Sequence, residues 1–174
     1  MLTHFKPTNV AALIVIAIVS IALHANGQSF EVRLVHPNND MIVSSKASDM
    51  DLRGYEKFIW KGKKENEELW VSKKAEIDTY DLKRAQISFG PRNDPQVIIL
   101  LTDRGGKKLA EFTGANVRRR TATLLDGQIL KTSVISMQVT GGKIGIVGDF
   151  KIAEIKSIAD RINELIAKAG DADR

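Results

Sequence analysis

Few residues in this chain have side chains suited to covalent catalysis. The 174 residues include no cysteine and three histidines, His4, His24 and His36. The absence of cysteine excludes disulfides, thiolate metal sites and a cysteine nucleophile. Because two of the histidines lie in the N-terminal segment, a Ser-His-Asp triad would depend on His36, which stands beside Pro37 in a predicted turn.

Carboxylates are the remaining candidates for catalysis. The sequence contains no HExxH motif, EF-hand loop or multi-histidine metal pattern. Its acidic residues fall on predicted turns and solvent faces, and no pair of them stands out as an acid and base. We therefore predict a protein that is not an enzyme and uses no cofactor or metal. A secreted enzyme with an unrecognised carboxylate site is the alternative.

Two local patterns could bind anions. Gly105-Gly106 follows a predicted strand and opens a helix, but GxGxxG and GxxxxGK[ST] motifs are absent, so phosphate binding is not expected. Arg118, Arg119 and Arg120 form the densest basic cluster. Cations are favoured at a helix C-terminus, which gives the cluster a structural explanation, and contact with an anionic lipid, a peptide or another partner is the alternative.

The overall charge does not indicate a nucleic-acid partner. The net charge is +5 and the pI is about 9.5. Basic and acidic residues alternate in segments such as 61–68 (KGKKENEE), which is typical of a solvated mixed-charge surface.

The N-terminal segment 1–27 predicts export. Val10–Leu23 is an apolar run of 14 residues, which at ~1.5 Å per residue is shorter than a bilayer core. Ala25-Asn26-Gly27 supplies small residues for cleavage, so we predict a secretory signal peptide, with a short uncleaved anchor as the alternative. The expected location is periplasmic, or on the outer side of the inner membrane with membrane contact only through an uncleaved N-terminus.

After this segment the chain alternates between short strand-like and helical patterns. A half-buried strand is expected at Phe30–Val35, a loop at Met41–Leu52, and a hairpin from Tyr55–Trp60 and Leu69–Lys73. Trp60 and Trp70 are interpreted as sheet anchors in preference to a ligand-stacking pair. A short helix at Tyr80–Ala85 and a strand at Gln86–Phe89 should follow.

The C-terminal part contains the clearest elements. The strand Gln96–Leu101 leads into a helix at Asp103–Val117 that Thr102 can cap. Asp126-Gly127 and Gly141-Gly142 predict tight turns. Isoleucines recur at helical spacing in the last helix, at Ile152, Ile155, Ile158, Ile162 and Ile166. We expect Ile155, Ile158 and Ile162 to be buried against one sheet containing Val97, Ile99 and Leu124. The fold class predicted is α+β, an antiparallel or mixed sheet packed by two main helices.

The order of these residues resembles the head part of the first periplasmic domain of SecD/SecDF, accessory membrane proteins of bacterial protein export. Arg118 replaces the family's usual glycine, Gln138 a usual proline and Lys151 a threonine cap. The matching residues are Thr102, Gly105, Lys107, Lys108, Ala110, Glu111, Thr113, Asn116, Val117, Arg120, Leu125-Asp126-Gly127, Thr140-Gly141-Gly142, Ile146, Gly148, Phe150 and Glu154.

The resemblance implies a SecDF head-like α+β domain over 54–167, preceded by a leading strand and loop over 28–53 and followed by a flexible tail over 168–174. It also implies a binding domain that contacts polypeptide or an envelope protein, in connection with the export machinery. An envelope module unrelated to export is a further alternative.

Overall fold

The structure is a computed structural model that describes residues 28–45, 51–61 and 66–172. The predicted signal peptide, and the anchor alternative to it, lie outside the described residues. Within the described ranges, no helix is both long and apolar enough to cross a membrane.

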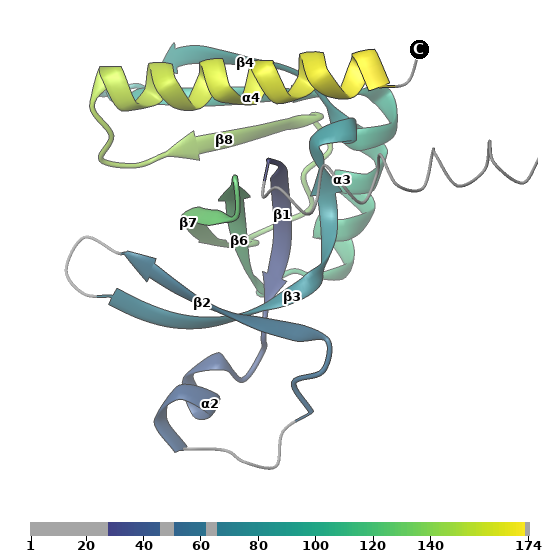
Figure 1. Cartoon of the computed structure of the whole chain (residues 1–174), viewed down its shortest axis with the longest axis vertical. Coiled ribbons are helices and arrows are strands. Elements are labelled where there is room, and N and C mark those ends of the chain that lie inside the picture. Colours follow the sequence, from purple (N-terminus) through teal and green to yellow (C-terminus); the bar gives the residue numbers. More distant parts are fainter. Residues whose placement is uncertain (1–27, 46–50, 62–65, 173–174) are drawn as a thin grey trace, which may run out of the picture.

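Two antiparallel sheets form the framework (Figure 1). Sheet A has the strand order β2-β3-β1-β6-β7, and sheet B has the order β4-β5-β8. The α+β class is confirmed, although the strands that we expected in one sheet are divided between two. The strands are β1 (Phe30–Val35), β2 (Tyr55–Lys61), β3 (Asn66–Asp78), β4 (Leu82–Phe89), β5 (Pro95–Leu101), β6 (Arg120–Leu125), β7 (Gln128–Val134) and β8 (Lys143–Val147).

Two main helices pack on these sheets, α3 (Asp103–Ala115) and α4 (Ile152–Ala172). Thr102 caps α3 as predicted, since its hydroxyl accepts the Gly105 N–H at 3.0 Å. The helix α4 extends to Ala172, so the expected tail over 168–174 is largely helical. Buried Ala169 explains this, because it continues the apolar face of the helix.

The short helix α2 (Asn39–Ser45) lies where a loop was expected. Its first residue, buried Asn39, donates from Nδ2 to the Glu68 carbonyl at 3.1 Å and accepts the Trp70 N–H at Oδ1 at 2.8 Å. This contact with β3 fixes the start of the helix. The polar sequence of residues 41–52 does not predict this helix, because the contact that stabilises it is with residues of β3, far away in the chain.

Sheet B and α4 enclose the main core. Ile155 and Ile162 are fully buried, Ile158 is nearly so, and they join Val97 and Ile99 in one hydrophobic cluster. This part of the prediction is confirmed. Leu124 differs, because it belongs to a second cluster in sheet A. Ile152, at the first turn of α4, is exposed.

Sheet A is curled so strongly that its two edge strands, β2 and β7, contact each other. The concave face holds the second cluster, whose buried members are Val35, Leu69, Val71, Ala122 and Leu124. The opposite face contributes Phe30 and Val32 to the main core. The strand β1 is therefore buried on both faces. The prediction of a half-buried strand was wrong, because it assumed a flat sheet with one face exposed to solvent.

One edge of sheet B is covered by a side chain of α4. The amide of Asn163 accepts the Ala85 N–H through Oδ1 and donates from Nδ2 to the Ala85 carbonyl, both at 2.9 Å. It therefore supplies the two hydrogen bonds that a neighbouring strand would give to the edge strand β4. The other edge strand, β8, pairs with β5 on one side and is the last strand of the sheet.

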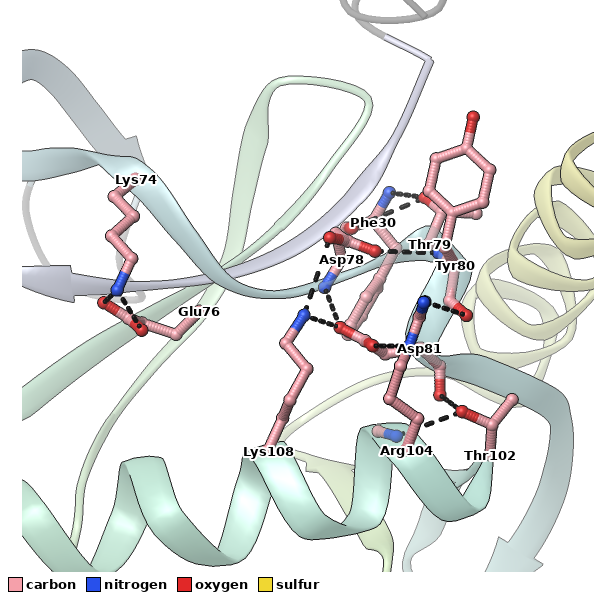
Figure 2. A network of polar contacts seen from close by, with 11 residues as sticks. Phe30, Lys74, Glu76, Asp78, Thr79, Tyr80, Asp81, Thr102, Arg104 and Lys108 are labelled. Carbon is pink, nitrogen blue, oxygen red and sulfur yellow. Dashed lines mark hydrogen bonds and ion pairs between the residues drawn. The ribbon is translucent and has the colours of Figure 1, made fainter.

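The two sheets are joined by η1, a 3-10 turn at Thr79–Asp81 between β3 and β4 (Figure 2). Asp78 caps this turn, but the expected helix at Tyr80–Ala85 is a three-residue turn followed directly by β4. The reason is Asp81. Its fully buried carboxylate accepts the Asp78 N–H and ion-pairs with Lys108 and Arg104 of α3, which fixes the turn and directs the chain away from a helix.

Backbone contacts complete this joint. The Thr102 N–H donates to the Asp81 carbonyl at 2.8 Å, and the Phe30 N–H donates to the Thr79 hydroxyl at 2.9 Å. Gly105 packs so closely that an added Cβ would lie 2.3 Å from the Asp81 carbonyl oxygen. Glycine is therefore required at position 105, where the two backbones approach closely. It is not required at Gly106, because a Cβ added there would lie 3.4 Å from its nearest atom.

We predict that Gly105→Ala lowers the free energy of unfolding by about 3 kcal/mol. The added methyl group would overlap the Asp81 carbonyl, so α3 and η1 would have to move apart. The matched control is Gly106→Ala, which removes a helical glycine with little overlap and should change stability by less than about 1 kcal/mol. Urea unfolding of both variants measures the difference. Equal midpoints would show that the joint does not have this geometry.

We also predict that Asn163→Asp lowers the free energy of unfolding by about 1–3 kcal/mol, because a carboxylate cannot donate to the Ala85 carbonyl. Ser157→Asp adds the same charge to an exposed position of α4 and should have a much smaller effect. Thermal unfolding of the two variants is the comparison. A similar loss in both would mean that charge, not the edge contact, is responsible.

Candidate functional site: a cleft beside an open strand edge

A cleft lies where sheet A, sheet B and α3 meet. Its walls come from β1, β6 and β7 of sheet A, from β8 of sheet B, and from α3. The segment after β7 forms one rim and is tied to α3, because Thr113 accepts the Val139 N–H at 2.8 Å and Gln138 donates to the Ala110 carbonyl at 3.1 Å. Gln138 thus helps to position the rim.

The lining of the cleft is apolar with hydroxyl groups. Leu109 and Phe112 of α3 contribute the apolar floor, and Thr121 and Thr123 of β6 contribute hydroxyls. The volume of about 210 Å³ is smaller than the ~300–1,000 Å³ typical of small-molecule sites. The cleft is therefore suited to one or two side chains of a larger partner and not to an enclosed substrate.

Two exposed apolar side chains mark the mouth of the cleft. Val134 is 63% exposed and Met137 is 68% exposed, and both line it. Methionine is common on surfaces that bind varied partners, because its flexible thioether adapts its shape. The sequence analysis missed both residues, since neither belongs to a periodic apolar pattern.

The strand β8 provides the polar part of the site. It pairs with β5 on one side and is the last strand of sheet B, and Lys143, Ile144 and Gly145 face the cleft. An edge strand presents unpaired N–H and C=O groups that can accept another strand. Apolar lining beside such an edge is the arrangement used for binding extended peptides by strand addition.

The three arginines at 118–120 do not act together. Arg120 is used inside the curl of sheet A, where it ion-pairs with Glu67, donates to Thr132 and lies 5.9 Å from the centre of the Trp60 ring. Hydrogen bonding to Arg120 lowers the pKa of Glu67. Arg118 is exposed, and Arg119 is half-buried at the edge of the sheet. A partner contact through these arginines stays a prediction.

The two tryptophans face opposite sides of sheet A and cannot form a stacking pair. Trp60 pairs with Glu67, two residues before Leu69, and packs against the concave cluster. Trp70 follows Leu69 and therefore points to the convex face. The interpretation of Trp60 as a sheet anchor is confirmed.

The other polar features of the described ranges do not form a second site with defined chemistry. No group of three His, Asp or Glu residues within them could hold a metal ion. Gly106 and Gly142 border an open hollow together with Lys83, Lys107 and Lys143, and nothing in it shows a ligand. The tight turn at Asp126-Gly127 is confirmed, with φ values of 50° and 74°.

The fold and the cleft together define a two-sheet α+β domain with one strand edge open beside an apolar cleft. The family described as SecDF, P1 head subdomain, matches residues 56–164, which is more than half of the chain. The chain belongs to this family, as its sequence resemblance predicted.

Named relatives agree with this family. The protein translocase subunit SecD of Magnetococcus marinus is 27% identical over 132 residues, which cover 74% of this chain and 25% of the relative. The SecD subunit of Acidaminococcus fermentans is 38% identical over 90 residues, which cover 51% of this chain and 22% of the relative. The chain thus spans about a quarter of the length of these relatives.

Two solved structures show the same fold. SecDF in a super-membrane-facing form superposes with a TM-score of 0.59 at 24% identity, covering 84% of this chain and 20% of that one. A structure of SecDF described as a membrane component that enhances protein export gives a TM-score of 0.55 at 22% identity, covering 93% of this chain and 70% of that one.

Arg118 has a φ of 69°, in the left-handed region that favours glycine. A residue with a Cβ is strained there by about 1–2 kcal/mol. We predict that Arg118→Gly raises the free energy of unfolding by about 0.5–1 kcal/mol, less than the full strain because glycine also gains freedom in the unfolded chain. Arg118→Ala is the control, since it removes the side chain and keeps the strain. If alanine stabilises the protein as much as glycine, strain is not the cause.

Proposed function

We propose that this domain is a non-enzymatic, exported module that holds extended polypeptide segments during protein export. It works at the outer side of the inner membrane, beside the export machinery. The family and the names of the relatives, which are protein translocase subunits, support the connection with export. The observation that carries the proposal is the open edge of β8 beside the apolar cleft.

The chemistry of the cleft fits a polypeptide of varied sequence. Hydrogen bonds to the β8 backbone depend on the peptide main chain, which every polypeptide has. Because successive side chains of a strand point to opposite faces, every second side chain of the bound segment would enter the cleft. Its apolar lining and threonine hydroxyls accept small and medium side chains without demanding one residue type.

The one fully buried carboxylate of the described residues offers no support for catalysis. Asp81 is held by Lys108 and Arg104 and serves the joint between the sheets. It does not line the cleft. The non-enzymatic function is therefore preferred to the carboxylate-enzyme alternative, and no covalent step is proposed.

The test is binding of a fluorescent twelve-residue peptide of alternating valine and threonine, with lysines added at both ends for solubility. The full chain in detergent should bind it, and Val134→Asp or Met137→Asp should weaken binding about tenfold or more, because each places a charge at an apolar contact. The matched control is Ile152→Asp, which adds the same charge at a residue 61% exposed on α4 and should bind like the parent.

A second peptide separates strand addition from unspecific apolar binding. Proline at every second position keeps the peptide apolar but removes the N–H groups that pair with a sheet edge. It should not bind measurably. Equal binding of the two peptides, or equal weakening by Ile152→Asp, would overturn the proposal.

A further inference from the structure

Three side chains lie in one row across the convex face of sheet A. The antiparallel register pairs Val35 with Val71 and Leu34 with Thr121, so His36 stands between Trp70 of β3 and Arg119 before β6. The His36 N–H confirms the first neighbour by donating to the Trp70 carbonyl at 2.7 Å. Neighbours in register share a face, so the three side chains point to the same side.

Two of these side chains have buried donors without acceptors. The indole Nε1 of Trp70 and the Nε of Arg119 are both buried and have no hydrogen-bond partner. Buried donors are almost always paired, because desolvation without a hydrogen bond is costly. Two unpaired donors, one on each side of His36, therefore favour an external acceptor at this row.

His36 adds a third donor. Its Nδ1 accepts the Asn38 N–H at 3.1 Å, so the neutral ring carries its proton on Nε2. Burial, together with the charge of Arg119, lowers the pKa of His36 and favours this neutral form. The Tyr55 ring fixes its orientation through an edge contact, with the ring centres 4.5 Å apart.

The surroundings leave the positive charge of Arg119 uncompensated. Its guanidinium has neither a hydrogen bond nor an ion pair with any described residue. The nearby carboxylates of β3 have other cationic partners, Arg120 for Glu67 and Lys57 for Glu68. The row thus offers one charged fork and two neutral N–H donors, and it presents no carboxylate.

We propose that Trp70, His36 and Arg119 form a binding site for a carboxylate of a polypeptide partner, supplied by an acidic side chain or by the terminal carboxylate. A planar carboxylate has the two oxygens that a guanidinium fork binds in parallel, and its remaining lone pairs can accept from the indole and the imidazole. This site is separate from the cleft proposed above, and it can bind whether or not the cleft holds a strand.

Three labelled peptides test the site and identify the source of the carboxylate. Hexaglutamate with a blocked C-terminus carries side-chain carboxylates, hexaglutamine with a free C-terminus carries a terminal one, and hexaglutamine with both ends blocked is the neutral control. The full chain in detergent should bind at least one of the first two and not the third. Binding of the neutral peptide with equal affinity, or tighter binding of inorganic phosphate than of either acidic peptide, would overturn the proposal.

Variants then locate the binding. Arg119→Gln and Trp70→Phe should each weaken binding roughly tenfold, because each removes donors to a charged acceptor. Arg118→Gln is the control, because it removes the same charge from the adjacent, exposed residue. It should change affinity less than about twofold. Equal weakening by Arg118→Gln and Arg119→Gln would show unspecific attraction by a basic surface.

The two tryptophans provide a readout that does not depend on variants. The indole N–H resonance of Trp70 should move in proton–nitrogen NMR spectra as the acidic peptide is added, and should saturate with the binding curve. The resonance of Trp60, on the opposite face, should stay in place. Movement of neither resonance at saturating peptide, or of both equally, would contradict a site at Trp70.

Discussion

The buried carboxylate of Asp81 is the interaction on which the arrangement of the two sheets depends. A charge in the interior is stable only when it is paired and hydrogen-bonded. Asp81 is paired with the cations of α3 and its Oδ2 accepts the Asp78 N–H, while its Oδ1 faces Arg104 without a hydrogen bond. Because the chain passes from β3 of sheet A to β4 of sheet B at this turn, the ion pairs also fix α3 against the joint between the sheets. The position of the cleft follows from this, since α3 forms its floor.

The curl of sheet A divides the side chains of its strands between two faces. Its concave face is filled by an apolar cluster and by Arg120 with its partners. Its convex face carries Val32 and Thr123 in the cleft and, at the far end, the row of Trp70, His36 and Arg119. The basic segment 118–120 is thereby divided by strand alternation, so that the adjacent residues Arg119 and Arg120 lie on opposite faces of the sheet.

Features that depend on neighbours in sequence could be predicted. The Thr102 cap, the turn at Asp126-Gly127 and the isoleucine face of α4 were predicted correctly, because each is set by local geometry or helical period. The helix α2, the short turn at η1 and the division into two sheets were missed, because distant contacts through Asn39 and Asp81 determine them. The cleft was missed for the same reason, since an edge strand is defined by which strands do not pair with it.

The contact of Asn163 with Ala85 also bears on self-association. Fibrous aggregates of sheet proteins grow when each molecule can pair at both edges of a sheet, so that every copy extends the array. In sheet B one edge is obstructed at Ala85 by the side chain of Asn163 and the other is open at β8. Two copies meeting through β8 would form a closed pair with no second edge of this sheet free to recruit a third. A domain that we propose to accept foreign strands is in this way hindered from polymerising with itself.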